Sequence, residues 1–363
     1  MLDNQSLPPL LAQAFVPSLS DGLCKSSSVS QATQLDSFDV RSVLDADAVT
    51  RGYASSAQQS EGSTDYAIQE IKSVLDRFMK ECKYKCPRSP RNLELRESIA
   101  LEVASWGVKL PEAHAKKIVD TACRFAETAY IHLSPEHQAF VARYTAYFIY
   151  SDDLGAHHLE ALGQFARRFA NGERQLDPVL ERLAEMVKRS HELWTTIGSN
   201  SIITGTLDAL MGYHLEFTTP NMVIRPGATR FPDYMRYRTG INPPFIAFIF
   251  MRSWEFTTES YLQLIPELES WIGFVNDLFS FYKEHLAHEA NNYICIRAAA
   301  EQTPPLVILR RLADEMLETT YRIYRLAEGD TALSELLHGY IQRYLEFHLD
   351  TPRYRLAELG LTA

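Results

Sequence analysis

The chain has 363 residues, of which 46% are hydrophobic and 23% are charged, and its net charge is −10 at pH 7. This is an ordinary globular composition, and no run approaches the roughly 20 uninterrupted apolar residues that a membrane span needs. The negative charge disfavours nucleic acid as a partner. It suits a site that gathers divalent cations, although a solvated acidic surface would explain it equally well.

The first part of the chain differs from the rest. Residues 1–64 contain "CKSSSVSQATQ" and "YASSAQQSEGSTD", which are rich in Ser, Gln and Ala and poor in large apolar residues. Such segments bury too little surface to offset their ordering entropy, so we expect a low-complexity, mostly disordered leader. Its beginning, with Asp3 and no basic cluster, is a poor match to a signal or transit peptide. We therefore expect a soluble, cytoplasmic protein.

From Tyr66 onward, apolar residues recur at the three- and four-residue spacing of helices, and alternating strand patterns are absent. Examples are "YAIQEIKSVLDRFMKEC", "EAHAKKIVDTACRFAETAY" and "SIITGTLDALMGYHLEF", with Pro and Gly falling mainly between the helical blocks. The pattern predicts a single all-α domain over residues 65–363, built as a helical bundle around a central cavity.

The first polar motif in chain order is "YFIYSDD", where an apolar helix ends in Asp152 and Asp153. Adjacent carboxylates at the mouth of a buried helix repel each other unless a positive group lies near them, and a divalent cation would meet that need. A solvated helix end is the alternative.

The second motif is "DYMRYRTGINPP", in which Arg236 and Arg238 precede a helix break at Gly240. A guanidinium matches the oxygens of a phosphate, and a break inside a bundle is best tolerated beside a cavity. A surface pair of arginines is the alternative.

The third motif is "WIGFVNDLFSFYKE". On a helix, a step of four residues returns nearly to the same face, so Asn276, Ser280 and Glu284 form one stripe. Amide, hydroxyl and carboxylate oxygens are the ligands that Mg²⁺ prefers, and the absence of Cys and His makes zinc a poor candidate. Lys283 can address an anion held by the metal. Alternatively, these are polar residues tolerated in a helix.

The last motif is "FHLDTPRYRL", where Arg353 and Tyr354 follow an apolar helix and a proline. The arginine can pair with a phosphate and the tyrosine hydroxyl can donate a hydrogen bond to it. An ordinary transition from helix to tail is the alternative.

Together these motifs resemble class I terpene cyclases, and in particular the fungal trichodiene synthase family. The Asn-Ser-Glu stripe resembles the metal-binding motif of that class, and the acid pair at Asp152 resembles the start of its aspartate-rich motif. Arg236 to Gly240 is similar to its diphosphate-sensing arginine and helix break, and "RY" at 353 to its C-terminal Arg-Tyr pair. The resemblance spans roughly residues 142–356 with the same order of motifs.

The resemblance implies a class I terpenoid synthase fold and a carbon–oxygen lyase that ionises farnesyl diphosphate and cyclises the carbocation to a sesquiterpene, in fungal secondary metabolism. It implies three Mg²⁺ ions, held by Asp152, Asn276, Ser280 and Glu284. It also implies that the diphosphate is bound by Arg236, Lys283, Arg353 and Tyr354.

One position departs from the motif, because Ala156 stands where many members carry a third acid. A longiborneol-type cyclase is therefore as plausible as trichodiene synthase itself. Aromatic faces attract cations, so residues near the motifs are candidates for the substrate pocket, with core packing as the alternative role. These candidates are Phe148, Phe217, Phe245, Phe248 and Phe274.

Two other functions stay open at this point. A prenyltransferase that elongates isoprenyl diphosphates would need a second aspartate-rich motif in place of the Asn-Ser-Glu stripe. A non-catalytic helical scaffold or isoprenoid-binding protein would keep the fold without turnover. A homodimer is a further option that the sequence leaves open.

Overall fold

The fold is known from a computed structural model that describes residues 65–254 and 256–363. These residues fall within one compact unit. The predicted leader, residues 1–64, lies outside the described residues. Over the described ranges the chain is helical and contains no strand, apart from an isolated bridge between Trp194 and Met251. The prediction of an all-α protein is confirmed.

The helical part begins with residues 65–81, which are helical throughout. The longer helices that follow are α2 (Leu93–Ala104), α3 (Glu112–Thr128), α4 (Pro135–Leu154), α5 (Leu159–Ala170), α6 (Pro178–Lys188), α7 (Thr196–Thr218), α8 (Phe231–Thr239), α9 (Asn242–Ala247), α11 (Ile265–Leu286), α12 (Tyr293–Glu301), α13 (Pro305–Leu326) and α14 (Thr331–Asp350). Short elements are η1 (Gly155–His157), η2 (Ser190–Glu192), α10 (Thr258–Tyr261), η3 (Leu262–Leu264), η4 (Pro352–Tyr354) and η5 (Leu356–Leu359).

Local sequence explains where many of these helices begin. Ser134 caps α4 by accepting a hydrogen bond from the backbone of His137, and a proline occupies the first turn. Asp177 and Asp330 cap α6 and α14 in the same way. A side-chain oxygen at the cap satisfies an amide that has no partner inside the helix, and a proline loses nothing there.

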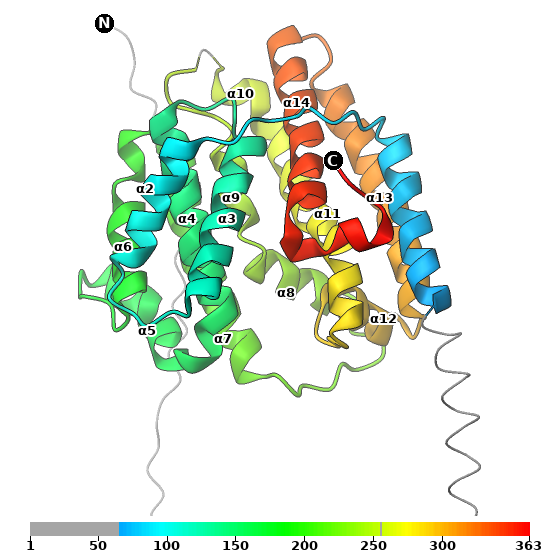
Figure 1. The fold of residues 1–363 in the computed structure, drawn as a ribbon, viewed down its shortest axis with the longest axis horizontal. Helices are drawn as coiled ribbons and strands as arrows, with labels where there is room; N and C mark the ends of the chain where they lie inside the picture. The colour runs from blue at the N-terminus through cyan, green and yellow to red at the C-terminus, as the bar shows by residue number, and fades with distance from the viewer. Residues whose placement is uncertain (1–64, 255) are drawn as a thin grey trace, which may run out of the picture. The chain divides into compact units, whose positions relative to one another are not determined.

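The helices surround a central space. In Figure 1, α3, α4 and α7 stand on one side and α11 and α14 on the other, while α8 crosses between them. The packing pairs α3 with α4, α7 with α9, α11 with α13 and α14 with α3. After α14 the chain turns back so that η4 packs on α11, which carries the C-terminal Arg-Tyr pair to the same space.

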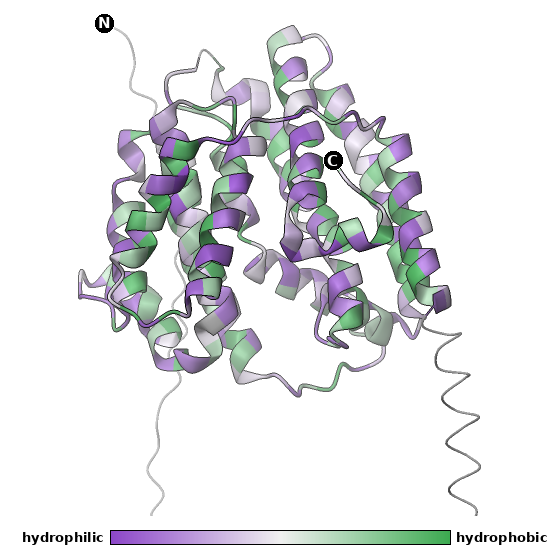
Figure 2. Cartoon of the chain, in the orientation of Figure 1, coloured by the Kyte–Doolittle hydropathy of each residue, from purple (hydrophilic) through white to green (hydrophobic). Residues whose placement is uncertain are grey.

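Each helix has both hydrophilic and hydrophobic residues along its length, as Figure 2 shows. This is the pattern of amphipathic helices that bury one face against their neighbours. Within the described ranges, no helix has the length and apolar character to cross a membrane.

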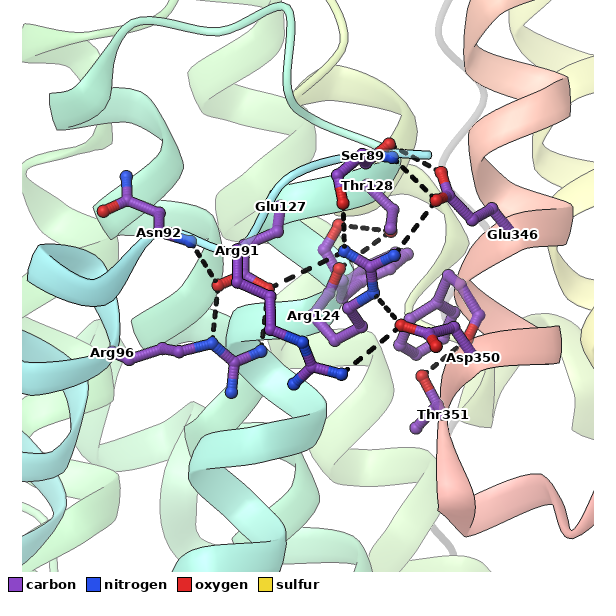
Figure 3. Close-up of polar contacts among 12 residues, drawn as sticks. Ser89, Arg91, Asn92, Arg96, Arg124, Glu127, Thr128, Glu346, Asp350 and Thr351 are labelled. Atoms are coloured by element: carbon purple, nitrogen blue, oxygen red, sulfur yellow. Dashed lines mark hydrogen bonds and ion pairs between the residues drawn. The ribbon is translucent and has the colours of Figure 1, made fainter. Parts of the chain in front are cut away.

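A largely buried group of charges joins α3 to α14 (Figure 3). The Arg124 guanidinium lies 3.0 Å from Glu346 Oε1, 2.7 Å from Asp350 Oδ2 and 3.0 Å from the carbonyl oxygen of Ser89, and Glu127 lies 3.9 Å away. Glu346 also accepts hydrogen bonds from the backbone and hydroxyl of Ser89. We call these five residues the α3–α14 brace. Because Arg124 on α3 pairs with both Glu346 and Asp350 on α14, the brace ties the end of α14 to α3 just before the chain turns into η4.

Candidate active site

The central space is a cavity of about 330 Å³ lined by α3, α4, α7, α8, α9, α11, α12, α14 and η4. It brings together all eight polar residues that the sequence singled out for metal and diphosphate: Asp152, Arg236, Asn276, Ser280, Lys283, Glu284, Arg353 and Tyr354. The motifs lie up to 200 residues apart in sequence, so only the fold makes them neighbours.

The stripe on α11 lies on the cavity side of that helix. Asn276, Ser280 and Glu284 all line the cavity, whereas Leu278 and Phe279 are fully buried in the core. Lys283 Nζ lies 3.1 Å from Glu284 Oε1, so a cation already stands beside the last carboxylate of the stripe. Three kinds of oxygen donor thus face one space along two turns of a helix.

Asn276 has a specific set of partners. Its Nδ2 lies 3.1 Å from the Tyr354 hydroxyl oxygen and 3.2 Å from Nε2 of His348. Burial raises the pKa of Tyr354 to about 12, so the phenol keeps its proton and can donate it. Burial lowers the pKa of His348 to about 3, so the imidazole is neutral. Sequence reasoning missed His348, because nothing in "FHLD" marks that histidine as facing α11.

The two adjacent acids at the end of α4 point to different surroundings. Asp152 lines the cavity, and its side chain is 46% exposed within it. Asp153 does not line the cavity and is only 15% exposed, since its carboxylate lies 3.5 Å from Lys117 Nζ and 3.7 Å from His114 Nε2. Arg353 reaches both acids, at 3.1 Å from Asp152 and 3.3 Å from Asp153.

The helix break between α8 and α9 shapes a further part of the wall, next to α11. Arg236 donates from Nε to Asp277 Oδ2 at 2.7 Å and from its second amino group to the carbonyl of Gly273 at 2.7 Å. A side chain at Gly240 would lie 2.6 Å from the carbonyl oxygen of Arg236, so only glycine fits at the end of α8. Ile241 then takes a left-handed backbone, with φ of 57°, that turns the chain into α9.

The other arginine of that motif serves the packing. Arg238 forms an ion pair with Asp208 on α7 and does not line the cavity. Of the two arginines in "DYMRYR", the structure therefore brings only Arg236 to the site.

Carboxylates outnumber cations in the cavity wall. Five acids line it, namely Asp152, Glu216, Asp277, Glu284 and Glu289, against three bases, Arg236, Lys283 and Arg353. Burial, followed by the nearby charge of Asp152, raises the pKa of Glu216 to about 7. An excess of negative charge would repel a diphosphate unless cations were bound with it.

Glu216 and Glu289 were not among the predicted site residues. Glu216 follows Tyr213 by three residues on α7, and both line the cavity, so helical spacing from a cavity aromatic was the available signal. Glu289 lies in the loop after α11, where no periodicity exists to place it.

The oxygen donors of this wall match a hard divalent cation in kind, because they are carboxylate, amide and hydroxyl groups. In the described part of the chain, no three His, Cys, Asp or Glu side chains are gathered closely enough to form a ready-made metal cluster. Asp152 on α4 and the stripe on α11 instead face each other across the cavity.

Two of the five predicted pocket phenylalanines line the cavity, Phe148 on α4 and Phe245 on α9. The other three are not among its lining residues. Phe248 is fully buried between Trp194 and Phe140. Phe274 packs on Tyr237 and Tyr293, and Phe217 packs on Tyr213 and fills the space beside Gly155. Helical spacing does not separate these three from the lining residues, because each lies three or four residues from one of them, as Phe217 does from Tyr213. Packing against other helices decides their orientation.

Aromatic residues from α3 and α14 take their place. Phe125 and Phe347 line the cavity with ring centroids 4.8 Å apart, and Phe245 packs on Phe125 at 5.0 Å. Tyr213 and Tyr344 complete this aromatic part of the wall. The cavity wall therefore combines charged side chains with a set of aromatic rings.

The fold is that of the class I terpene synthases. It is similar to the crystal structure of linalool/nerolidol synthase from Streptomyces clavuligerus, with a TM-score of 0.58 and 13% identity, covering 73% of this chain and 99% of that one. Among curated proteins, the chain is 26% identical over 294 residues to alpha-cuprenene synthase COP6 of Coprinopsis cinerea (80% of this chain, 90% of the relative). It is 27% identical over 306 residues to monoterpene synthase 25 of Postia placenta (84% of this chain, 90% of the relative).

The model of the trichodiene synthase (TRI5) family matches residues 108–361. The chain therefore belongs to the trichodiene synthase family of terpene synthases, as its motifs indicated.

Proposed function

We propose that this protein is a sesquiterpene cyclase, a carbon–oxygen lyase that ionises farnesyl diphosphate with Mg²⁺ and closes the resulting carbocation into a hydrocarbon or alcohol. One observation carries the proposal. Asp152 and the Asn276–Ser280–Glu284 stripe line a common cavity, together with three cationic side chains and a set of aromatic rings.

The metal would be held by Asp152 on one wall and by Asn276, Ser280 and Glu284 on the other, and three ions are the number that the family resemblance implies. Magnesium bound there would neutralise the charge that develops on the departing diphosphate. The surplus of carboxylates over cations in the wall supports this requirement for added positive charge.

The chain's own cations bind and orient the diphosphate. Arg236, Lys283 and Arg353 all line the cavity, and each can donate to phosphate oxygens. Tyr354 keeps its proton, because burial raises its pKa to about 12, and can add one more donor. When the C–O bond breaks, these groups stabilise the leaving pyrophosphate electrostatically.

The aromatic interior suits the carbocation that remains. The faces of Phe125, Phe148, Phe245 and Phe347 carry negative charge density that attracts a cation, and they offer no nucleophile to capture it early. Loss of a proton to pyrophosphate, or addition of water, would end the reaction.

Incubation of the purified protein with Mg²⁺ and farnesyl diphosphate, under a pentane overlay analysed by gas chromatography, tests the proposal. A volatile sesquiterpene supports it. A longer isoprenyl diphosphate would indicate a prenyltransferase, and unchanged substrate would indicate a non-catalytic binding protein. Geranyl and geranylgeranyl diphosphate belong in the same assay, because one relative is named a monoterpene synthase. The cytoplasmic location and the homodimer stay predictions.

A further inference from the structure

We propose that His348 is a positioning residue that holds the carboxamide of Asn276 with its oxygen free for a metal ion. The inference rests on the proposed function for the identity of that ion. It concerns the orientation of one amide group, whose oxygen and nitrogen are similar in size and differ in hydrogen bonding.

The contacts of His348 show which ring nitrogen carries its hydrogen. His348 lies on α14 with none of its surface exposed, and its Nδ1 is 2.8 Å from the carbonyl oxygen of Tyr344. A carbonyl oxygen can only accept a hydrogen bond, so Nδ1 must carry the hydrogen. Among the described residues no carboxylate pairs with this ring. A second proton would be an uncompensated buried charge, so Nε2 is left bare.

The protonation of His348 fixes the orientation of the Asn276 side-chain amide. The bare Nε2 of His348 can only accept, and the Asn276 side chain stands 3.2 Å from it. The group that faces the ring must therefore be the NH₂ of Asn276, since an oxygen there would set two lone pairs against each other. The second hydrogen of the same NH₂ is donated to the Tyr354 hydroxyl oxygen, 3.1 Å away.

This orientation leaves the amide oxygen of Asn276 free to bind a metal ion. With both amide hydrogens engaged, Oδ1 of Asn276 has no hydrogen-bond donor within the described part of the chain, and the residue lines the cavity. The Tyr354 oxygen accepts from Asn276, so its own hydrogen remains available to donate elsewhere. One buried histidine thus orients both an oxygen ligand and a hydroxyl donor.

The experiment compares His348→Leu, which removes the acceptor, with His348→Gln, whose side-chain oxygen can replace Nε2. The probe is Mg²⁺ with inorganic pyrophosphate, and the readout is the Mg²⁺ concentration that gives half of the thermal stabilisation, which needs no turnover. Loss of a partner that orients a metal ligand typically weakens affinity about 10–100-fold. We expect a shift of that size in His348→Leu and a much smaller one in His348→Gln.

His137→Leu is the matched control. His137 is also buried and hydrogen-bonded to a backbone carbonyl, that of Leu193 at 3.1 Å, but neither Leu193 nor its other partner, Ser134, lines the cavity. This variant should lose stability without moving the Mg²⁺ midpoint. Equal midpoints in wild type and His348→Leu would overturn the inference while leaving the proposed function intact. If the wild-type protein binds no Mg²⁺ in the presence of pyrophosphate, both this inference and the proposed function are refuted.

A second measurement observes the ring in the wild-type protein and uses a variant only to assign its signal. In ¹⁵N-histidine-labelled protein, the imidazole signal lost in His348→Gln should show a neutral ring protonated at Nδ1. A ring protonated at Nε2, or at both nitrogens, would reverse the amide and refute the inference.

Discussion

The neighbouring acids Asp152 and Asp153 allow a sharp test, because their side chains lie in different surroundings. Asp152 lines the cavity, whereas Asp153 is turned to Lys117 on α3 and to Arg353. Replacing each by Asn removes one negative charge and keeps the volume. We expect Asp152→Asn to impair both turnover and Mg²⁺ binding, and Asp153→Asn to impair turnover only.

The expected magnitudes follow from the contacts. Loss of one group that stabilises the developing charge typically reduces the rate 10²–10³-fold, about 2.7–4 kcal/mol, and this is our expectation for Asp152→Asn. Asp153 holds Arg353 at 3.3 Å and an exposed lysine at 3.5 Å, and Asn in its place can still accept one hydrogen bond. Weakening such a charged hydrogen bond costs about 1–2 kcal/mol, roughly 5–30-fold in rate.

The assay is product formation from farnesyl diphosphate at saturating substrate, over a Mg²⁺ titration, with circular dichroism as the check on folding. Asp152→Asn should raise the Mg²⁺ midpoint, and Asp153→Asn should leave it unchanged. Equal shifts of the midpoint in the two variants, or a larger one in Asp153→Asn, would refute the separation of roles.

Three further predictions follow from the same structure. Asn276→Ala and Glu284→Ala should each lower turnover about 10²–10³-fold, with helicity unchanged by circular dichroism. Full activity in both variants would refute the metal-binding role of the α11 stripe. Arg124→Ala leaves the buried carboxylate of Glu346 without its cationic partner and should reduce the free energy of unfolding in urea by about 3–5 kcal/mol, against about 0–1 kcal/mol for the exposed Arg189→Ala; equal losses would contradict the stabilising role of the brace. Because the pKa of Glu216 is raised from 4.5 to about 7, the metal-free protein should lose stability as pH rises between these two values. Glu216→Gln should flatten the dependence of Tm on pH. An unchanged slope would contradict the raised pKa of Glu216.

Much of the fold could be predicted from the sequence, because helix formation is local. Apolar residues at three- and four-residue spacing predicted the helices, and Pro and Gly marked most of their ends. The stripe on α11 was predictable for the same reason, since residues four apart share a face of any helix. The order of the four motifs then carried the family resemblance that the family model supports.

The rest depended on packing between segments far apart in the chain. Sequence could not tell Asp152 from Asp153, because the difference lies in which helix each one faces once α3 and η4 are in place. Nor could it separate Phe245, which lines the cavity, from Phe248, which fills the core three residues later.

The amino-acid sequence by itself determined the helices, the oxygen-donor stripe and the class of chemistry, since these follow from local spacing and residue type. The tertiary structure alone decided which side chains meet in the cavity, as with Glu216 from α7 and His348 from α14. The physical reason is that orientation and charge at the site are set by contacts between helices, and those contacts exist only once the bundle has closed around the cavity.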